Sequence, residues 1–333
     1  MDSDIETLIA NLTADGAVWN VDDSLCSYDV QTTDSLVSPY AATCTIVVKE
    51  RQSENTVVVK ELKDPEEEVY WPVAHLGNPH DVSVDRQGRL CIADTRHGHV
   101  RYVDSDGMIR SLAGAAFQWD KGDGGPANSA CLVHVLSVAH DAQDHLYLGD
   151  AGAGRIRRVD ARTGVIETIA GCGQIGYQGD GGPADRAQLG HPAALAFDRA
   201  GQLYFADSKY HVLRKVDRSG RIETIAGTGQ PGFSPDGTSA RAAQIHTPFG
   251  LIVAADGRVY FADSYNHRVR RITVSGQLET VAGCASAGDA GISGPAAAAL
   301  NEPHGLCLYG DQILLISDRN NNRIKAVRVD VDC

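Results

Sequence analysis

The sequence has no apolar run of the roughly 18 residues that a membrane-spanning helix needs, and we expect no membrane span. Positive charge is also scarce, because 30 Lys and Arg face 43 Asp and Glu, for a net charge of −13. A nucleic-acid surface needs clustered Lys and Arg to neutralise phosphates. The deficit therefore argues against nucleic-acid binding and against binding to anionic membranes.

The eight cysteines contain no C-x-x-C pair, and Cys91 and Cys307 lie in apolar runs, where cysteine usually acts as a small hydrophobic residue. The acidic start, Met1-Asp-Ser-Asp-Ile-Glu6, lacks the basic and then apolar order of a signal peptide. Free thiols and the missing secretion signal predict a cytoplasmic protein.

What the sequence does contain is a motif repeated five times. Its clearest copy reads Gly257-Arg-Val-Tyr-Phe-Ala-Asp263-Ser-Tyr-Asn-His267-Arg-Val-Arg-Arg-Ile272 and is followed by Leu278-Glu-Thr-Val-Ala-Gly283. Each copy has an aspartate at the same place, and steps of 56, 57, 56 and 55 residues separate these anchor aspartates, which are Asp94, Asp150, Asp207, Asp263 and Asp318. A period this regular indicates stacked structural units.

Each unit holds four short runs of Val, Ile, Leu, Phe and Tyr separated by Gly, Asp and Asn, which is the pattern of a four-stranded propeller blade. The stretch Ala262-Asp-Ser-Tyr-Asn-His-Arg-Val269 resembles the NHL repeat, and residues 206–213 and 317–324 are close variants. The resemblance covers roughly residues 72–330 and implies an NHL-type β-propeller. It says little about function, because propellers host enzymes, scaffolds and nucleic-acid binders.

The fifth unit ends after residues 323–329 with no outer strand, and an open blade edge favours aggregation. We therefore expect an all-β, six-bladed propeller that forms one domain over residues 1–333. Residues 72–333 would supply five NHL-like repeats, and residues 1–71 would supply a degenerate blade that closes the ring. Five blades is the alternative.

Within the closing region, residues 44–50 and 56–61 are predicted to form a hairpin, because both are rich in Val and flank the turn at 53–55. Residues 16–21 are a further candidate strand. Residues 22–43 are polar without a helical period and are interpreted as a loop.

Two repeated features have a structural explanation. The linkers carry Gly122-Asp-Gly-Gly-Pro-Ala127 and Gly179-Asp-Gly-Gly-Pro-Ala184, where glycine permits a positive φ and Pro-Ala opens a short helical turn. No Lys-Ser/Thr follows, as a phosphate-binding loop would require. Each anchor aspartate ends a strand at a turn, where its carboxylate can accept backbone N–H groups.

Function is expected where the repeat departs from its consensus, at the first residues of the inner strands, which begin near the channel axis. Aligning the strands that start at Pro79, Val133, Pro192, Pro248 and Pro303 gives a column of His80, His134, Ala193, Phe249 and His304. Three neutral imidazoles that converge on the axis would bind Zn²⁺ and leave a fourth position for water or substrate. Three ordinary histidines bonded to turn carbonyls is the alternative.

Pro79-His80-Asp81 and Pro303-His304-Gly305 resemble the zinc-binding stretches of an NHL-like lyase family, which cleaves peptidyl-α-hydroxyglycine to an amide and glyoxylate. Val133-His134-Val135 matches less well. The resemblance implies a base at Tyr265 and a functional arginine at Arg319. The family takes its histidines from alternate blades, whereas here they would come from units 1, 2 and 5, and Ala193 stands where the family has histidine. The reaction therefore need not be the same.

Arg96, Lys209 and Arg319 lie on turns that emerge on the same face, and we predict that they orient an anionic substrate. Phe117 and Trp119 of a linker would wall a pocket there.

Together these residues predict a metal-dependent lyase or hydrolase that acts on a small anionic molecule. His80, His134 and His304 would hold Zn²⁺, and Tyr265 would act as base. The alternative is a non-enzymatic NHL propeller that docks a partner protein. The substrate, the metal and the oligomeric state do not follow from the sequence.

Overall fold

The computed structural model describes residues 76–115, 121–288, 299–309 and 312–329, together with the backbone of three strands, β1 (Ser27–Thr32), β2 (Cys44–Lys49) and β3 (Thr56–Val58). Contacts divide the chain into two compact units, one of residues 1–76 with 102–110 and one of residues 77–101 with 111–333. The single domain expected over residues 1–333 stays a prediction. Within the described ranges, no helix has the length and apolar character needed to cross a membrane.

The first unit contains an antiparallel sheet in the order β1-β2-β3. The pairing of β2 with β3 confirms the predicted hairpin. The loop interpretation of residues 22–43 is wrong in part, because Ser27–Thr32 pairs along the whole length of β2. Tyr28 and Val30 alternate with polar residues there, which is a strand pattern too short to stand out. The strand predicted at 16–21 lies outside the described residues.

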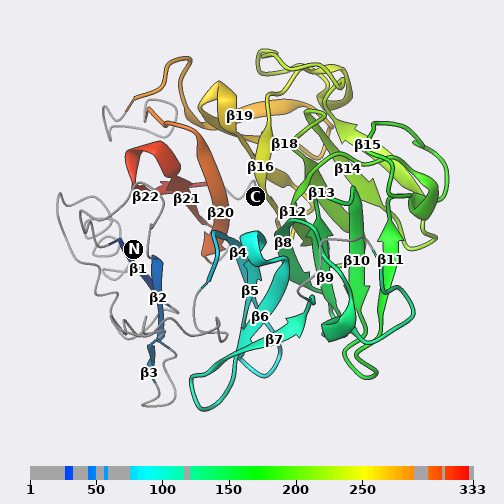
Figure 1. The fold of residues 1–333 in the computed structure, drawn as a ribbon. Helices are drawn as coiled ribbons and strands as arrows, with labels where there is room; N and C mark the ends of the chain where they lie inside the picture. The colour runs from blue at the N-terminus through cyan, green and yellow to red at the C-terminus, as the bar shows by residue number, and fades with distance from the viewer. Residues whose placement is uncertain are drawn as a thin grey trace. The chain divides into compact units, whose positions relative to one another are not determined.

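Five further sheets are the blades of a β-propeller, and Figure 1 follows them from cyan to red along the chain. Blade 1 has the order β4-β5-β6-β7, with β4 (Pro79–Val84), β5 (Leu90–Asp94), β6 (His99–Val103) and β7 (Ile109–Ala113). Blade 2 holds β8 (Val135–His140), β9 (Leu146–Asp150), β10 (Arg155–Val159) and β11 (Ile166–Ala170). Blade 3 holds β12 (Pro192–Phe197), β13 (Leu203–Asp207), β14 (Val212–Val216) and β15 (Ile222–Ala226).

Blade 4 holds β16 (Pro248–Val253), β17 (Val259–Asp263), β18 (Arg268–Ile272) and β19 (Leu278–Gly283). Blade 5 has three strands among the described residues, β20 (Pro303–Tyr309), β21 (Ile313–Asp318) and β22 (Arg323–Arg328). The all-β propeller is thus confirmed, but the prediction of six blades is wrong, because the described residues form five. The N-terminal hairpin takes β1 as its third strand and forms a separate sheet of its own.

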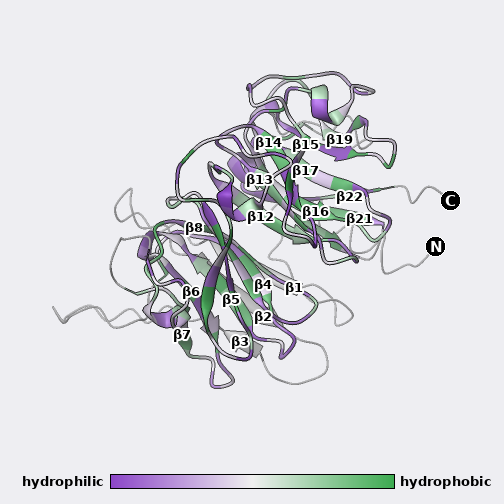
Figure 2. Cartoon of the chain, turned by 90° about the vertical axis from the view of Figure 1, so that its right-hand side faces the viewer, coloured by the Kyte–Doolittle hydropathy of each residue, from purple (hydrophilic) through white to green (hydrophobic). Residues whose placement is uncertain are grey.

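The first strand of each blade is its inner strand, and consecutive inner strands contact one another from β4 through β8, β12 and β16 to β20. Hydrophobic cores lie between neighbouring blades: Phe205 of β13 shares one with Ile156 of β10, and Phe261 of β17 shares the next with Leu213 of β14. Figure 2 shows this pattern as hydrophobic colour on the strands and hydrophilic colour on many of the turns. Alternating strand residues therefore join the blades to one another.

The anchor aspartates hold the segment that leads into each inner strand. Their carboxylates are fully buried and accept backbone N–H groups, as from Gly77 to Asp94 at 2.6 Å and from His246 to Asp263 at 2.6 Å. Equivalent bonds reach the other three, Asp150, Asp207 and Asp318. The structural interpretation of these residues is confirmed.

The glycine-rich linkers also fold as predicted. Gly122 and Gly179 have φ angles of 109° and 99°, which side chains other than glycine rarely adopt. Short 3₁₀ turns follow Pro126 and Pro183, at η2 (Ala127–Ser129) and η3 (Ala184–Arg186).

Each of these linkers is fastened by an arginine that is buried in the blade which the linker enters. Arg214 of β14 is fully buried and donates to Asp180 Oδ1 at 2.7 Å and to the carbonyl oxygens of Gln188 and Gln178 at 2.9 and 3.2 Å. Arg157 of β10 contacts Asp123 in the same way. A buried guanidinium is tolerated here because its donors meet a carboxylate and several carbonyls.

Candidate functional site

The start of every inner strand carries the same irregularity. Pro79 pairs with Asp94, and regular pairing of β4 with β5 resumes only at Val82. Bulges of this kind re-aim the side chains within them. The residue directly after the first paired one lies in the irregularity in all five blades, and these five residues line one cavity of about 340 Å³: His80, Leu136, Ala193, Phe249 and His304.

This register corrects the predicted histidine column. Val135, not Val133, pairs with Asp150, so Val135 is the counterpart of Pro79. Leu136 therefore takes the column position in blade 2, and His134 lies one residue before the inner strand, where blade 3 has His191. The residues around His134 resemble those around His80, but the number of residues to the anchor aspartate differs, and this number fixes the strand register.

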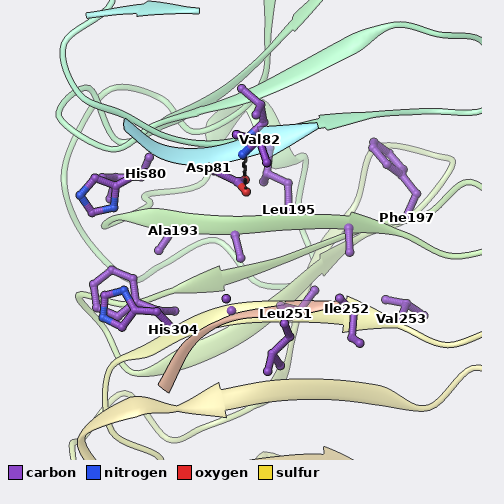
Figure 3. Close-up of a pocket in the computed structure, with 18 residues that line it drawn as sticks. His80, Asp81, Val82, Ala193, Leu195, Phe197, Leu251, Ile252, Val253 and His304 are labelled. Atoms are coloured by element: carbon purple, nitrogen blue, oxygen red, sulfur yellow. Dashed lines mark hydrogen bonds between the residues drawn. The ribbon is translucent and has the colours of Figure 1, made fainter. Parts of the chain in front are cut away.

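Two of the predicted histidines do meet at one end of the cavity. Figure 3 shows His80 and His304 at the same end, with Ala193 between them in the view and Phe197 and Val253 at the opposite end. The imidazole of His304 stacks on the ring of Phe249, with centroids 4.1 Å apart. Arg319, in the turn after Asp318, brings Nη1 to 3.5 Å from His304 Nε2 and to 3.3 Å from Glu302 Oε2.

Both imidazoles favour their neutral form. Burial, and then the charges of Arg319 and His80, lower the pKa of His304 to about 3. The pKa of His80 is lowered by desolvation, although part of this side chain stays exposed, and then by Arg319 and His134. At neutral pH this end of the cavity thus presents uncharged N–H donors beside a guanidinium.

Two further histidines, His134 and His191, directly precede the inner strands of blades 2 and 3. His191 has a pKa lowered by burial, then by Lys209, with a smaller contribution from His134. His134 also lowers the pKa of His80, so it lies within electrostatic reach of both His80 and His191. Sequence analysis missed His191, although its place directly before Pro192 matches that of His134 before Val135.

Asp81 is another residue that sequence analysis did not single out. It lines the cavity, and its two carboxylate oxygens accept the N–H groups of Val82 and of Val138 in the next blade, both at 2.9 Å. Burial raises the pKa of Asp81 to about 7, because the two N–H bonds offset the desolvation only partly.

The remaining predicted residues lie elsewhere. Tyr265 is in η5 (Ser264–Asn266), is 47% exposed, and packs edge-on against His246 with ring centroids 5.2 Å apart. It is not among the residues that line the cavity. Arg96 is an exposed residue of η1 (Thr95–His97). Phe117 and Trp119 fall outside the described residues.

The described side chains do not fit the predicted zinc site. They contain no group of three or more His, Cys, Asp or Glu arranged to hold a metal ion. The position beside His304 Nε2 is taken by the cationic Arg319, which would repel a metal ion there. The metal therefore stays a prediction.

Comparison with known proteins gives a family and relatives. The NHL repeat model matches residues 76–101. Protein SUPPRESSOR OF QUENCHING 1, chloroplastic, of Arabidopsis thaliana is 27% identical over 260 residues, which cover 73% of this chain and 24% of the relative. NHL repeat-containing protein 2 of Bos taurus is 25% identical over 271 residues, 72% of this chain and 37% of the relative. The chain thus spans less than two fifths of either relative.

An auxiliary nutrient binding protein from Bacteroides ovatus has a similar solved structure, with a TM-score of 0.62 and 15% identity over 91% of this chain and 66% of that one. At this identity the similarity shows the fold alone. The matched repeat, the relatives named for NHL repeats and the blades of the structure together identify a β-propeller that contains an NHL repeat.

Proposed function

We propose that this propeller binds a small anionic molecule at the end of the cavity where His80, His304 and Arg319 lie. The observation that carries the proposal is the Arg319 guanidinium 3.5 Å from Nε2 of His304, which lines a cavity formed by all five inner strands. A guanidinium offers a planar set of donors that matches carboxylate and phosphate.

The surrounding charge supports the same class of ligand. The protein as a whole carries a net charge of −13, so the cationic Arg319 beside the neutral imidazoles of His80 and His304 stands out as a place where an anion is attracted. A neutral imidazole still has one N–H group that can donate to such a ligand.

The predicted metal-dependent lyase or hydrolase is a narrower version of this function. It requires a third metal ligand in addition to His80 and His304. It also requires the Arg319 guanidinium to move away from His304 Nε2, so that this nitrogen can bind the metal ion. Metal analysis of protein purified without a His tag tests it: about one equivalent of zinc, lost in the His80→Ala/His304→Ala double variant, would establish the metalloenzyme.

Anion binding is tested by calorimetric titration with inorganic phosphate and with hexanoate. Arg319→Gln is expected to weaken the tighter of the two by about tenfold or more, because hydrogen bonds to a charged group contribute about 1.5–3 kcal/mol. Arg218→Gln, which removes an exposed arginine from a turn of blade 3, is the matched control and is expected to change nothing. Absence of binding by either anion, or equal affinities in the two variants, would contradict the proposal.

The alternative, a propeller that docks a partner protein without chemistry, makes the opposite prediction. A partner captured by the folded protein would then bind equally well to wild type and to the Arg319→Gln variant.

A further inference from the structure

Resting on the anion site proposed above, we infer that the group bound at Arg319 is the carboxylate of an α-amino acid and that Glu302 binds its ammonium group. The ligand would thus carry a negative and a positive group on the same carbon atom. The inference follows from an ion pair whose two residues both depart from the pattern of the repeat.

Arg319 differs from the residues at the corresponding place in the other four blades. The residue directly after the anchor aspartate is small and buried in those blades: Thr95, Ala151, Ser208 and Ser264. Ser264, for example, donates its hydroxyl group to the carbonyl oxygen of Pro303, at the start of the next inner strand, at 2.6 Å. The side chain of Arg319 is instead 56% exposed and contacts Glu302 and His304. An exposed cation thus stands where the repeat has a small buried residue.

Glu302 differs from its counterparts as well. The residue directly before the first paired residue of the inner strand carries no carboxylate in the other blades: Asn78, His134, His191 and Thr247. The backbone of Glu302 is fixed, with the φ of 52° that Thr247 also has and with its N–H group donated to Nδ1 of His267 at 3.3 Å. Only the side chain therefore departs from the repeat. Two departures that contact each other in one blade are typical of a functional site.

The contacts of Arg319 leave one edge of its guanidinium available. Oε2 of Glu302, at 3.3 Å, and Nε2 of His304, at 3.5 Å, both lie against the same nitrogen, Nη1. Within the described part of the chain, Nε and Nη2 have no hydrogen-bond partner. A carboxylate binds such an edge through two parallel N–H···O bonds. The ligand can therefore bind while Glu302 and His304 keep Arg319 in place.

Glu302 has an oxygen that can accept from the ligand. Its Oε2 contacts Arg319, whereas Oε1 has no hydrogen-bond partner among the residues that the structure describes. The opposite charges of this pair lie close together, with 3.3 Å between Nη1 and Oε2. In an α-amino acid the nitrogen and the carboxyl carbon are about 2.5 Å apart, as the bond lengths and the angle at Cα require. Such a ligand can place its carboxylate at Arg319 and its ammonium group at Glu302 at the same time.

The charges around Arg319 favour a ligand that also carries a positive group. An anion that approaches Arg319 also approaches the carboxylate of Glu302, and this repulsion offsets part of the attraction. Asp81 lines the same cavity as His304 (Figure 3), whereas no Lys or Arg is among the described residues that line it. An ammonium group next to the carboxylate of the ligand removes this conflict.

The test is a calorimetric titration of the full chain at neutral pH with L-alanine, propionate, ethylamine and L-lactate. Propionate lacks the ammonium group, ethylamine lacks the carboxylate, and L-lactate carries a hydroxyl group in place of the ammonium group. L-Alanine is expected to bind more tightly than each of the other three by about tenfold or more, because it alone offers a charged partner to both residues.

Glu302→Gln separates the ammonium contact from the anion site. The variant keeps the size of the side chain and removes its charge, so L-alanine should lose about tenfold in affinity while propionate binds as tightly as before or more tightly. Glu279→Gln is the matched control, because it removes the carboxylate of another ion pair, with Arg271 of blade 4, and it should change neither affinity. The readout is the ratio of two affinities in one protein, which a loss of folded protein does not alter.

The outcomes distinguish this inference from the proposed function. Binding of propionate or L-lactate as tight as that of L-alanine would overturn the inference and leave the anion site intact. An unchanged ratio in Glu302→Gln would do the same. Absence of binding by L-alanine and by every anion, phosphate and hexanoate included, would instead contradict the proposed function. If Glu302→Gln does not fold, the four ligands on the wild-type protein still decide.

Discussion

His304 and Phe249 form a stacked pair across two blades, with ring centroids 4.1 Å apart and ring planes inclined by 17°. The strands that carry them approach so closely that a Cβ added to Gly250 would clash with the carbonyl oxygen of His304. The imidazole is therefore oriented by its neighbour in blade 4, and the spacing of β16 and β20 depends on a missing side chain.

Gly250→Ala should disturb both stability and binding. The added methyl group meets backbone, which cannot rotate away, so we expect a loss of about 1–3 kcal/mol in the free energy of unfolding, measured in urea. Hexanoate binding should weaken because His304 shifts. Gly305→Ala is the control, since its Cβ would meet only the Ser317 side chain, at 3.0 Å, and should cost less. Equal effects of the two substitutions would refute the spacing argument.

Anion binding should depend on pH through Asp81. Its pKa is raised to about 7, so the carboxyl is largely neutral at pH 6 and largely charged at pH 8. The lowered pKa values of His80 and His304 favour the neutral form of both imidazoles in this range. Hexanoate should therefore bind more tightly at pH 6 than at pH 8, as calorimetry can show.

Asp81→Asn is the matched variant for this prediction, because it keeps the shape of the side chain and removes the titration. It should bind hexanoate with the same affinity at both pH values. A wild-type affinity that does not change between pH 6 and 8 would show that Asp81 does not act on the ligand.

His211 should make stability sensitive to acid. Its Nδ1 accepts the N–H of Thr247 at 3.0 Å, across the boundary between blades 3 and 4, and this needs the neutral ring. Burial, and then His246, lower the pKa of His211, so the unfolded chain binds more protons than the folded one below the usual value of 6.5. The contribution is present above that value and is lost as the pH falls through 6.5 toward the folded pKa.

The measurement is thermal or urea unfolding of wild type and His211→Asn at pH 7.5 and 5. Asparagine also adopts a positive φ, as Asn322 does at the same place in blade 5. The difference in unfolding free energy between the two pH values should be smaller in the variant. An identical pH dependence would mean that the contact contributes nothing.

Arg214 should contribute strongly to stability, although a charged residue in a strand is expected to be exposed. Removing it leaves the carbonyl oxygens of Gln188 and Gln178 without this donor and leaves a cavity, so Arg214→Ala should cost about 3 kcal/mol in urea unfolding. The exposed Arg218, four residues later, should cost less than about 0.5 kcal/mol on the same substitution. Comparable losses would contradict the role given to Arg214.

The period of the anchor aspartates was enough to predict the blades, because each repeat must bury the same face against its neighbours. The same regularity could have placed the site correctly. Fifteen residues separate Pro79 from Asp94 and Val135 from Asp150, and this interval assigns Leu136, not His134, to the column. Asp81 and His191 were missed because their environments depend on strands from other repeats.

The N-terminal strands were harder to predict, because this part of the sequence has no copy of the repeat whose spacing could locate them. The alternation in β1 is only six residues long, and a polar segment with one short strand is indistinguishable from a loop by composition. The buried arginines were also unpredictable, since Arg157 and Arg214 are each followed by another cation, Arg158 or Lys215, that is only partly buried.

Each glycine-rich linker is bound by a buried arginine of the blade that it enters, and these contacts define where one repeat unit of this protein begins. Pro183 bridges to Arg221 and Pro126 to Val165, so both linkers are bound to the blade that they enter. The unit that can be exchanged or duplicated with its buried arginine still satisfied therefore opens with the glycine-rich segment and finishes with the outer strand, as in residues 172–226. A graft cut at the inner strand would separate Arg214 from the backbone that satisfies it.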